Sequence, residues 1–275
     1  MTERATVRVT VTDPVDPRLA DFVALSDPET RRQVERDGDY FVVEGILAIE
    51  RLLALPQWRI RALALLPRVA DRLTKSLSRL PDDVVVAVAD EDALRAVVGF
   101  DIHRGALASV ERQARADAPD LLTGSGLFVA AEGLNDHENL GSLYRNAAAF
   151  GVTAVLLDPA CADPFYRRSV RVSLGNVLAV PTGRLDPLPG GLHQLHDLGA
   201  TTIALTPSAD LALRDLNRAK LGPGPIVVLV GAEGPGLSDG ALAAATHRVS
   251  IPMASGVDSL NVATAAAVVL HHLSG

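Results

Sequence analysis

Short apolar runs alternate with amphipathic stretches along the 275 residues of the chain. The clearest runs are residues 60–66, 127–131, 154–157 and 226–230. Apolar runs of this length between turn signals are typical of buried strands, whereas apolar residues at spacings of three and four predict helices. Strands that alternate with helices predict an α/β fold with a mostly parallel sheet that is covered on both faces.

The N-terminal part of the chain predicts a compact α/β domain. Residues 1–17 are interpreted as a loose arm, and residues 27–30 as a helix start before a charged run to residue 39. Expected strands are residues 41–43, 60–66, 84–88 and 106–110, and expected helices are residues 44–55, 69–80 and 91–98. About a hundred residues is a common size for one domain.

The pattern restarts after a stretch of charges, Ala, Pro and Gly without period. This predicts an N-terminal domain of residues 1–112, a linker of residues 113–125 and a C-terminal domain of residues 126–275. In the C-terminal domain, strands are expected at residues 127–131, 154–157, 177–180, 202–205, 226–230 and 249–251, and helices at residues 139–150, 164–174, 192–198 and 259–273.

Three loops of the C-terminal domain are candidate sites, because ligands of parallel sheets bind beyond the carboxyl ends of the strands. They are residues 132–140, 231–238 and 252–259. Spacing alone gives each an ordinary interpretation: Asn139 and Ser259 as helix N-caps, and Glu233 as an exposed turn residue. The glycines of the second loop are in the wrong order for a dinucleotide fingerprint, which disfavours a nucleotide-binding oxidoreductase.

Composition and charge narrow the classes of protein. The net charge of −7 argues against a sequence-independent nucleic-acid coat protein. Residues 51–79 are nevertheless locally basic. They are interpreted equally well as an RNA-docking surface and as a solvated face. No run reaches the roughly 18 apolar residues of a membrane helix. With one cysteine, no HExxH-like histidine spacing and no signal core, a cytoplasmic protein without a structural metal is expected.

Taken in order, the three loops resemble the signature motifs of the SPOUT superfamily, and most closely those of its SpoU (TrmH-like) branch of RNA ribose 2′-O-methyltransferases. The motifs are Asn139-x-Gly141-x-x-x-Arg145, Gly231-Ala232-Glu233-Gly234-x-Gly236-Leu237-Ser238, and Ile251-Pro252-Met253 with Ser259-Leu260-Asn261-Val262. The resemblance spans about residues 126–275. Two positions depart from the family pattern: His137-Glu138 stand where Pro-Gly is common, and Asn146 stands where Thr is common.

The resemblance implies an S-adenosylmethionine-dependent RNA 2′-O-methyltransferase whose C-terminal domain forms a trefoil knot. Residues 41–45 and 103–105 resemble an attached, ribosomal-protein-like α/β domain that binds the RNA substrate. By the same resemblance, the cofactor is held near Leu205, Thr206, Gly231, Glu233, Gly234, Ile251, Met253 and Leu260. The implied catalytic residues are Arg145, Asn139, Glu233, Ser259 and Asn261. Residues 163–175 resemble the family's basic helix, in which Arg167, Arg168 and Arg171 either bind RNA or form a solvated face.

Two roles are open for Arg145. Arginine is a poor general base at neutral pH. The favoured role is therefore to clamp the adjacent phosphate and to polarise the ribose 2′-hydroxyl. Acting as the base ranks second and requires neighbours that favour the neutral form. The expected substrate is ribosomal RNA ahead of transfer RNA. The resemblance also implies a homodimer through the C-terminal domain, and the nearly all-apolar last helix agrees with this. The alternative is a non-catalytic RNA-binding protein that retains the knotted fold.

Overall fold

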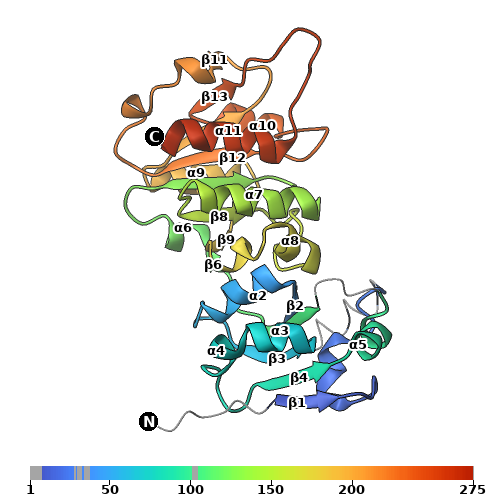
Figure 1. The fold of residues 1–275 in the computed structure, drawn as a ribbon. Helices are drawn as coiled ribbons and strands as arrows, with labels where there is room; N and C mark the ends of the chain where they lie inside the picture. Colours follow the sequence, from blue (N-terminus) through green and yellow to red (C-terminus); the bar gives the residue numbers. More distant parts are fainter. Residues whose placement is uncertain (1–7, 28, 30–32, 34–37, 101–104, 275) are drawn as a thin grey trace. The chain divides into compact units, whose positions relative to one another are not determined.

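The structure, a computed structural model, describes residues 8–27, 29, 33, 38–100 and 105–274 (Figure 1). The chain forms two compact units, and the N-terminal stretch of the first runs to Gln113, next to the expected domain boundary. The first unit also contains Phe165–Leu178, and the second consists of Ala114–Pro164 and Ala179–Gly275. The prediction placed residues 165–178 in the C-terminal domain, whereas this division assigns them to the first unit.

The first unit contains a five-stranded mixed sheet in the order β1-β4-β3-β5-β2. β4 pairs in parallel with β1 and β3, whereas β5 is antiparallel to β3 and β2. The strands are β1 (Arg8–Val11), β2 (Tyr40–Glu44), β3 (Ile60–Leu65), β4 (Val85–Ala89) and β5 (Ala106–Glu111). The helices are η1 (Pro17–Phe22), α2 (Ile46–Leu53), α3 (Pro67–Arg72), α4 (Thr74–Leu77), α5 (Glu91–Val98), α8 (Arg167–Val172) and η2 (Asn176–Leu178).

Two expectations for this unit are corrected. The prediction of a loose arm is wrong for residues 8–11, because the alternating Val and Thr residues there form the strand β1 beside β4. The single helix expected at residues 69–80 is two helices, and they meet where the Thr74 hydroxyl donates to the carbonyls of Ala70 and Asp71. Most of the charged run expected to be helical, and His103 and Arg104, lie outside the described residues.

The segment 165–178 packs on β2 through aromatic and ionic contacts. Phe165 lies 5.0 Å from Phe41 and 5.2 Å from Trp58 between ring centroids. Glu44 has a side chain that is only 10% exposed, and it pairs with Arg167 at 2.8 Å and Arg171 at 3.5 Å. Two of the three arginines expected to bind RNA thus have an ion-pair partner inside this unit.

Glu44→Ala is expected to lower the free energy of unfolding of the first unit by ~3 kcal/mol, because it leaves the mostly buried Arg167 without its carboxylate. Urea unfolding followed by tryptophan fluorescence measures this, since the one tryptophan, Trp58, lies in the first unit. Asp92→Ala is the control: its side chain is 93% exposed, and a change within about 0.5 kcal/mol is expected. Equal midpoints for Glu44→Ala and wild type would contradict the prediction.

The second unit contains an eight-stranded sheet in the order β11-β13-β10-β12-β7-β8-β9-β6, and every pairing in it is parallel. The parallel sheet predicted for this part of the chain is confirmed. Its strands are β6 (Ala116–Asp117), β7 (Leu127–Ala131), β8 (Ala154–Leu157), β9 (Thr182–Arg184), β10 (Thr201–Leu205), β11 (Leu211–Ala212), β12 (Ile226–Val230) and β13 (His247–Ser250). Its helices are α6 (Ala118–Leu121), α7 (His137–Ala149), α9 (Gly190–Asp197), η3 (Leu213–Asp215), η4 (Arg218–Lys220), α10 (Asp239–Ala244) and α11 (Val262–Ser274).

Two segments next to this sheet differ in secondary structure from what their composition suggests. Residues 113–125, interpreted as the linker, contain β6 and α6 and bury Ala118 and Leu122. The strand expected at residues 177–180 is the 3-10 turn η2, and the sheet resumes only at β9. A short apolar run does not by itself distinguish a strand from a buried helical turn.

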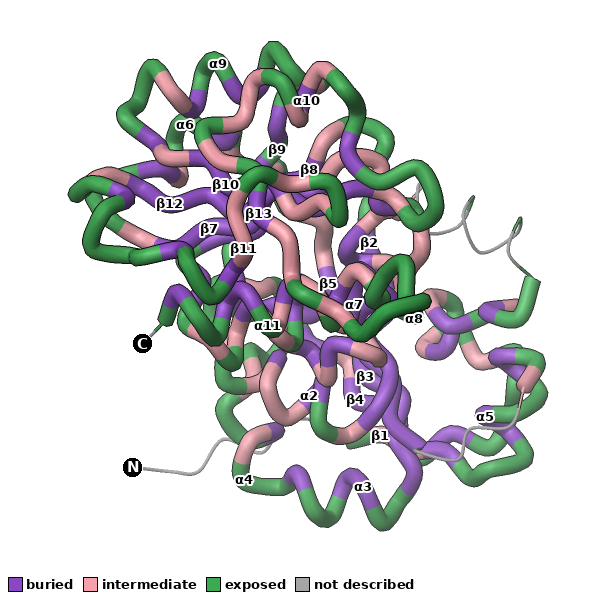
Figure 2. Tube along the Cα trace, turned by 90° about the horizontal axis from the view of Figure 1, so that it is seen from above, coloured by how far each residue is buried: buried purple, intermediate pink, exposed green. Residues whose placement is uncertain are grey.

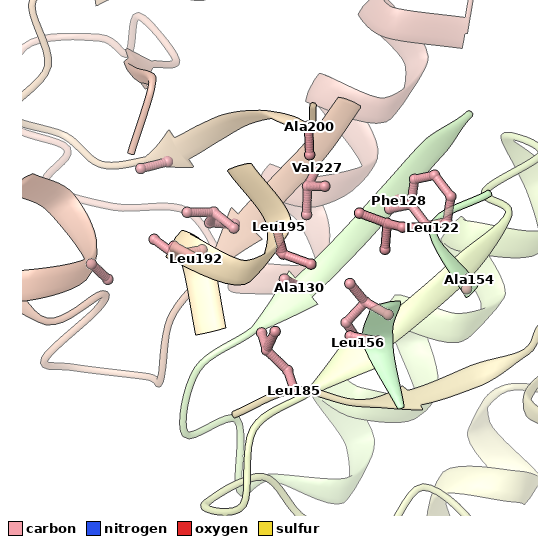
Figure 3. Packing of buried hydrophobic residues seen from close by; sticks show 14 of the residues in the cluster. Leu122, Phe128, Ala130, Ala154, Leu156, Leu185, Leu192, Leu195, Ala200 and Val227 are labelled. Atoms are coloured by element: carbon pink, nitrogen blue, oxygen red, sulfur yellow. The ribbon is translucent and has the colours of Figure 1, made fainter. Parts of the chain in front are cut away.

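The core of the second unit lies on both faces of its sheet, whose central strands are buried along their length (Figure 2). On one face, Phe128, Leu156 and Val227 pack with Leu192 and Leu195 of α9 (Figure 3). On the other face, α7 and α11 lie side by side (Figure 1). Loops follow the carboxyl ends of β10, β12 and β13.

Candidate active site

A pocket of about 470 Å³ lies at the carboxyl ends of the neighbouring strands β13, β10 and β12. Its volume is within the range of small-molecule sites. It is lined by the loops that follow these strands and by the start of α11. The lining includes all eight residues implied to hold the cofactor: Leu205, Thr206, Gly231, Glu233, Gly234, Ile251, Met253 and Leu260.

The loop after β12 folds back tightly on the end of its own strand. Ala232 and Gly236 form an isolated antiparallel bridge, and Gly234 and Gly236 have φ angles of 83° and 73°. A Cβ at Gly231 would lie 2.1 Å from the carbonyl carbon of Gly236 and 2.2 Å from the nitrogen of Leu237. Only glycine therefore fits at Gly231, and the exposed Glu233 is carried at the tip of the loop.

A chain of hydrogen bonds joins the three candidate loops. The amide nitrogen Nδ2 of Asn139 donates to the Glu233 carboxylate at 2.5 Å, and Nδ2 of Asn261 donates to Oδ1 of Asn139 at 2.7 Å. Oδ1 of Asn261 accepts from the backbone N–H groups of Ala263 and Thr264. A carboxylate accepts hydrogen bonds and a backbone N–H donates them. Glu233 at one end of the chain of bonds and the N–H groups of α11 at the other therefore fix the orientation of the side-chain amides of Asn139 and Asn261.

These bonds correct the interpretation of Asn139 and Ser259 as helix N-caps. The N-cap of α7 is Asp136, whose carboxylate accepts from the backbone N–H groups of Glu138 and Asn139. Asn139 is buried, with 8% of its surface exposed, and its side chain reaches the other loops. α11 begins at Val262, after Asn261, and Ser259 is an exposed residue on the rim of the pocket.

Arg145 is placed differently from the other implied catalytic residues. It is exposed on α7 and is not among the residues that line the pocket. The next residue, Asn146, donates through Nδ2 to the carbonyl of Ala263 at 2.8 Å and so fixes α7 against the first turn of α11. One copy of the chain therefore brings Glu233, Ser259 and Asn261 to the pocket lining, and Asn139 within hydrogen-bond distance of Glu233 and Asn261. Arg145 is not part of that lining.

The loop after β7 is held by residues that the sequence did not single out. Asp158 accepts from the backbone N–H of Gly133 at 3.0 Å. The Cys161 thiol accepts from the N–H of Leu134 and donates to the carbonyl of Ala131. Burial raises the pKa of Cys161 to about 12, so the thiol keeps the proton that it donates. These contacts join residues that are distant in sequence, and no local pattern indicates them.

The residues expected to bind RNA lie in the first unit. Several cations of residues 51–79 have partners there: Arg59 pairs with Asp83 and Glu111, Arg61 with Asp21, and Arg72 with Glu50. In the described part of the chain, no three metal-binding side chains gather into a possible metal site. Within the same residues, no helix is both long enough and apolar enough to span a bilayer.

Comparison with known proteins identifies the family of this site. The model of the SpoU rRNA Methylase family matches residues 126–271, which include all three loops. The chain belongs to the SpoU rRNA methylase family. An uncharacterized tRNA/rRNA methyltransferase of Mycobacterium bovis is 40% identical over 266 residues, which cover 95% of this chain and 90% of that protein.

Solved structures agree with the SpoU assignment. An AdoMet-bound rRNA methyltransferase from Sinorhizobium meliloti is 25% identical, with a TM-score of 0.79 over 97% of both chains. A crystal structure of an RNA 2′-O ribose methyltransferase is also 25% identical, with a TM-score of 0.73 over 97% of this chain and 98% of that one. The SPOUT fold with its parallel sheet is confirmed, and the chain is an RNA methyltransferase of the SpoU family. The trefoil knot stays a prediction.

In this SpoU protein, Asn139→Asp is expected to reduce methyl transfer about 100-fold or more at pH 8. The change places a carboxylate within hydrogen-bond distance of Glu233 and removes the donor between them. Activity should recover in part as the pH is lowered, since protonating one carboxyl restores a donor. A pH profile of initial rates measures this, with Asn135→Asp as the exposed control in the same loop. A profile parallel to that of the wild type would contradict the prediction.

Proposed function

We propose that this SpoU-family protein transfers a methyl group from S-adenosylmethionine to a ribose 2′-hydroxyl of RNA, with ribosomal RNA ahead of transfer RNA. One observation carries the proposal: the second and third motif loops line one pocket, and Asn139 of the first motif is joined to them by hydrogen bonds to Glu233 and Asn261. The similarity to a 2′-O ribose methyltransferase over nearly the whole chain supports the choice of ribose over a base.

The residues of the pocket fit S-adenosylmethionine. Leu205, Leu242 and Ile251 offer apolar walls to a purine, and the loop after β12 lines the pocket with backbone at Gly231, Gly234 and Gly236. The other residues implied to hold the cofactor also line the pocket: Thr206, Gly231, Glu233, Gly234, Met253 and Leu260. When bound, S-adenosylmethionine supplies an electrophilic methyl group on a sulfonium sulfur.

The polar edge of the pocket orients the acceptor. The Glu233 carboxylate can accept a hydrogen bond from a ribose hydroxyl, and Asn139 fixes the position of that carboxylate. Arg145 clamps the adjacent phosphate through its forked guanidinium and polarises the hydroxyl, while the alternative role as general base ranks second. Arg167 and Arg171 contribute RNA contacts only as far as Glu44 releases them, and Arg168 lies beside them on α8.

A homodimer through α7 and α11 is part of the proposal. α11 exposes Val268 (39%), and Leu260 on the loop before it is exposed to the same extent. Exposed apolar residues on and before α11 are compatible with an interface. Arg145 lies on α7 and outside the pocket of its own chain. Pairing through α7 and α11 would therefore bring Arg145 of one copy toward the acceptor site of the other. Light scattering of the purified protein measures the oligomeric state.

Two assays with the wild-type protein test the proposed function. Calorimetric titration with S-adenosylmethionine should show saturable binding, and titration with NAD should show none. Incubation with S-adenosylmethionine labelled in its methyl group should then transfer label to ribosomal RNA. Binding without any transfer to ribosomal or transfer RNA would favour the non-catalytic RNA-binding alternative. Absence of S-adenosylmethionine binding would reject the proposal.

A further inference from the structure

The loop that carries Glu233 has a second anchor outside the three motifs. Glu132, the first residue after β7, has a half-buried side chain beside the end of β12. Its carboxylate accepts two hydrogen bonds from one residue: Oε2 from the backbone N–H of Ser238 at 2.8 Å and Oε1 from the Ser238 hydroxyl at 2.7 Å.

These bonds fix the far end of the loop. Its near end is fixed by β12, since Val230 pairs with Ala131 and its carbonyl accepts from the N–H of Glu132. At the far end, Ser238 is the N-cap of α10, and its hydroxyl oxygen accepts from the N–H of Ala241 while the hydroxyl donates to Glu132. One carboxylate therefore sets where the loop ends and where α10 begins.

We infer that Glu132 is a positioning residue for the methyl donor: it holds residues 231–237 in the shape that lines the donor pocket, although it is not itself among the lining residues. Between Gly231 and Ser238, the backbone hydrogen bonding described within the loop is one bridge, its Glu233 side chain accepts from Asn139, and two of its glycines have positive φ angles. A loop with so little internal support depends on its end points. The inference rests on the proposed function, because it presumes that the pocket binds S-adenosylmethionine.

The test compares the affinity for S-adenosylmethionine of four proteins by calorimetry: wild type, Glu132→Gln, Ser238→Ala and the double variant. Glutamine keeps one acceptor but turns an amide donor toward the donating groups of Ser238, so Glu132→Gln should raise the Kd about tenfold. In the Ser238→Ala background the same change should have a clearly smaller effect, because the two residues act as a unit. Asp239→Asn removes a charge from the exposed first turn of α10 and should change the Kd less than about twofold.

Steady-state kinetics separate positioning from a general loss of stability. Glu132→Gln should raise the KM for S-adenosylmethionine about tenfold and leave the KM for ribosomal RNA within about twofold of the wild type. Parallel increases in both KM values, or a Kd for Glu132→Gln equal to that of the wild type, would overturn the inference while the proposed function stands. A wild type that does not bind S-adenosylmethionine would overturn both.

Discussion

Arg145→Ala is expected to reduce methyl transfer to RNA by about 100- to 1,000-fold, while the Kd for S-adenosylmethionine stays within about twofold of the wild type. The reason is its position: Arg145 is exposed on α7 and outside the residues that line the pocket, so its removal leaves the donor pocket intact. Single-turnover assays with labelled donor measure transfer, and calorimetry measures binding.

Two further variants give this prediction its controls. Arg145→Lys keeps the positive charge and loses the forked donor geometry, so activity between those of the wild type and Arg145→Ala is expected. Arg218→Ala removes another exposed arginine of the second unit, and its activity should equal that of the wild type. Full turnover by Arg145→Ala with an identified RNA substrate would reject a catalytic role for Arg145.

Gly231→Ala is expected to abolish detectable binding of S-adenosylmethionine and to destabilise the second unit by ~3 kcal/mol. The new methyl group would lie 2.1–2.3 Å from three backbone atoms of Gly236 and Leu237, which no rotamer change can relieve. The loop would have to move away from β12, and Glu233 would move with it. Calorimetry and thermal unfolding measure the two effects.

Gly190→Ala is the matched control for Gly231→Ala. Gly190 is the first residue of α9, and nothing lies within 4 Å of a Cβ built there. Alanine should therefore be neutral or slightly stabilising at that position. If Gly231→Ala bound S-adenosylmethionine as the wild type does, the close approach of the loop to its own strand would not shape the donor pocket.

The sequence predicts those elements whose pattern is local. β12 and α5 form at the residues expected from their apolar runs and spacing, and the parallel sheet follows from the alternation of strands and helices. The order of the three motifs also identifies the family. What the sequence leaves open are the long-range contacts. Asparagine is a common N-cap residue, and only the fold shows that the side chain of Asn139 forms hydrogen bonds with Glu233 and Asn261.

The segment 165–178 shows the same limit. Its arginines form a basic pattern typical of an RNA-binding helix, but their partner Glu44 is more than a hundred residues earlier in the chain. Ion pairs at such separation leave no local signal. Likewise, the two-residue strands β6 and β11 are too short for any periodicity to predict them, although they extend both edges of the sheet.

Mapping of ribose methylation tests the central claim most directly. Ribosomal and transfer RNA from cells that lack the gene are incubated with the purified protein and labelled S-adenosylmethionine, and the nucleosides are then identified by mass spectrometry. We predict that the label appears on the ribose of a defined nucleotide, and that it is absent from the reaction with Arg145→Ala. Label on a base, or equal labelling by the wild type and Arg145→Ala, would contradict the proposed site and its mechanism.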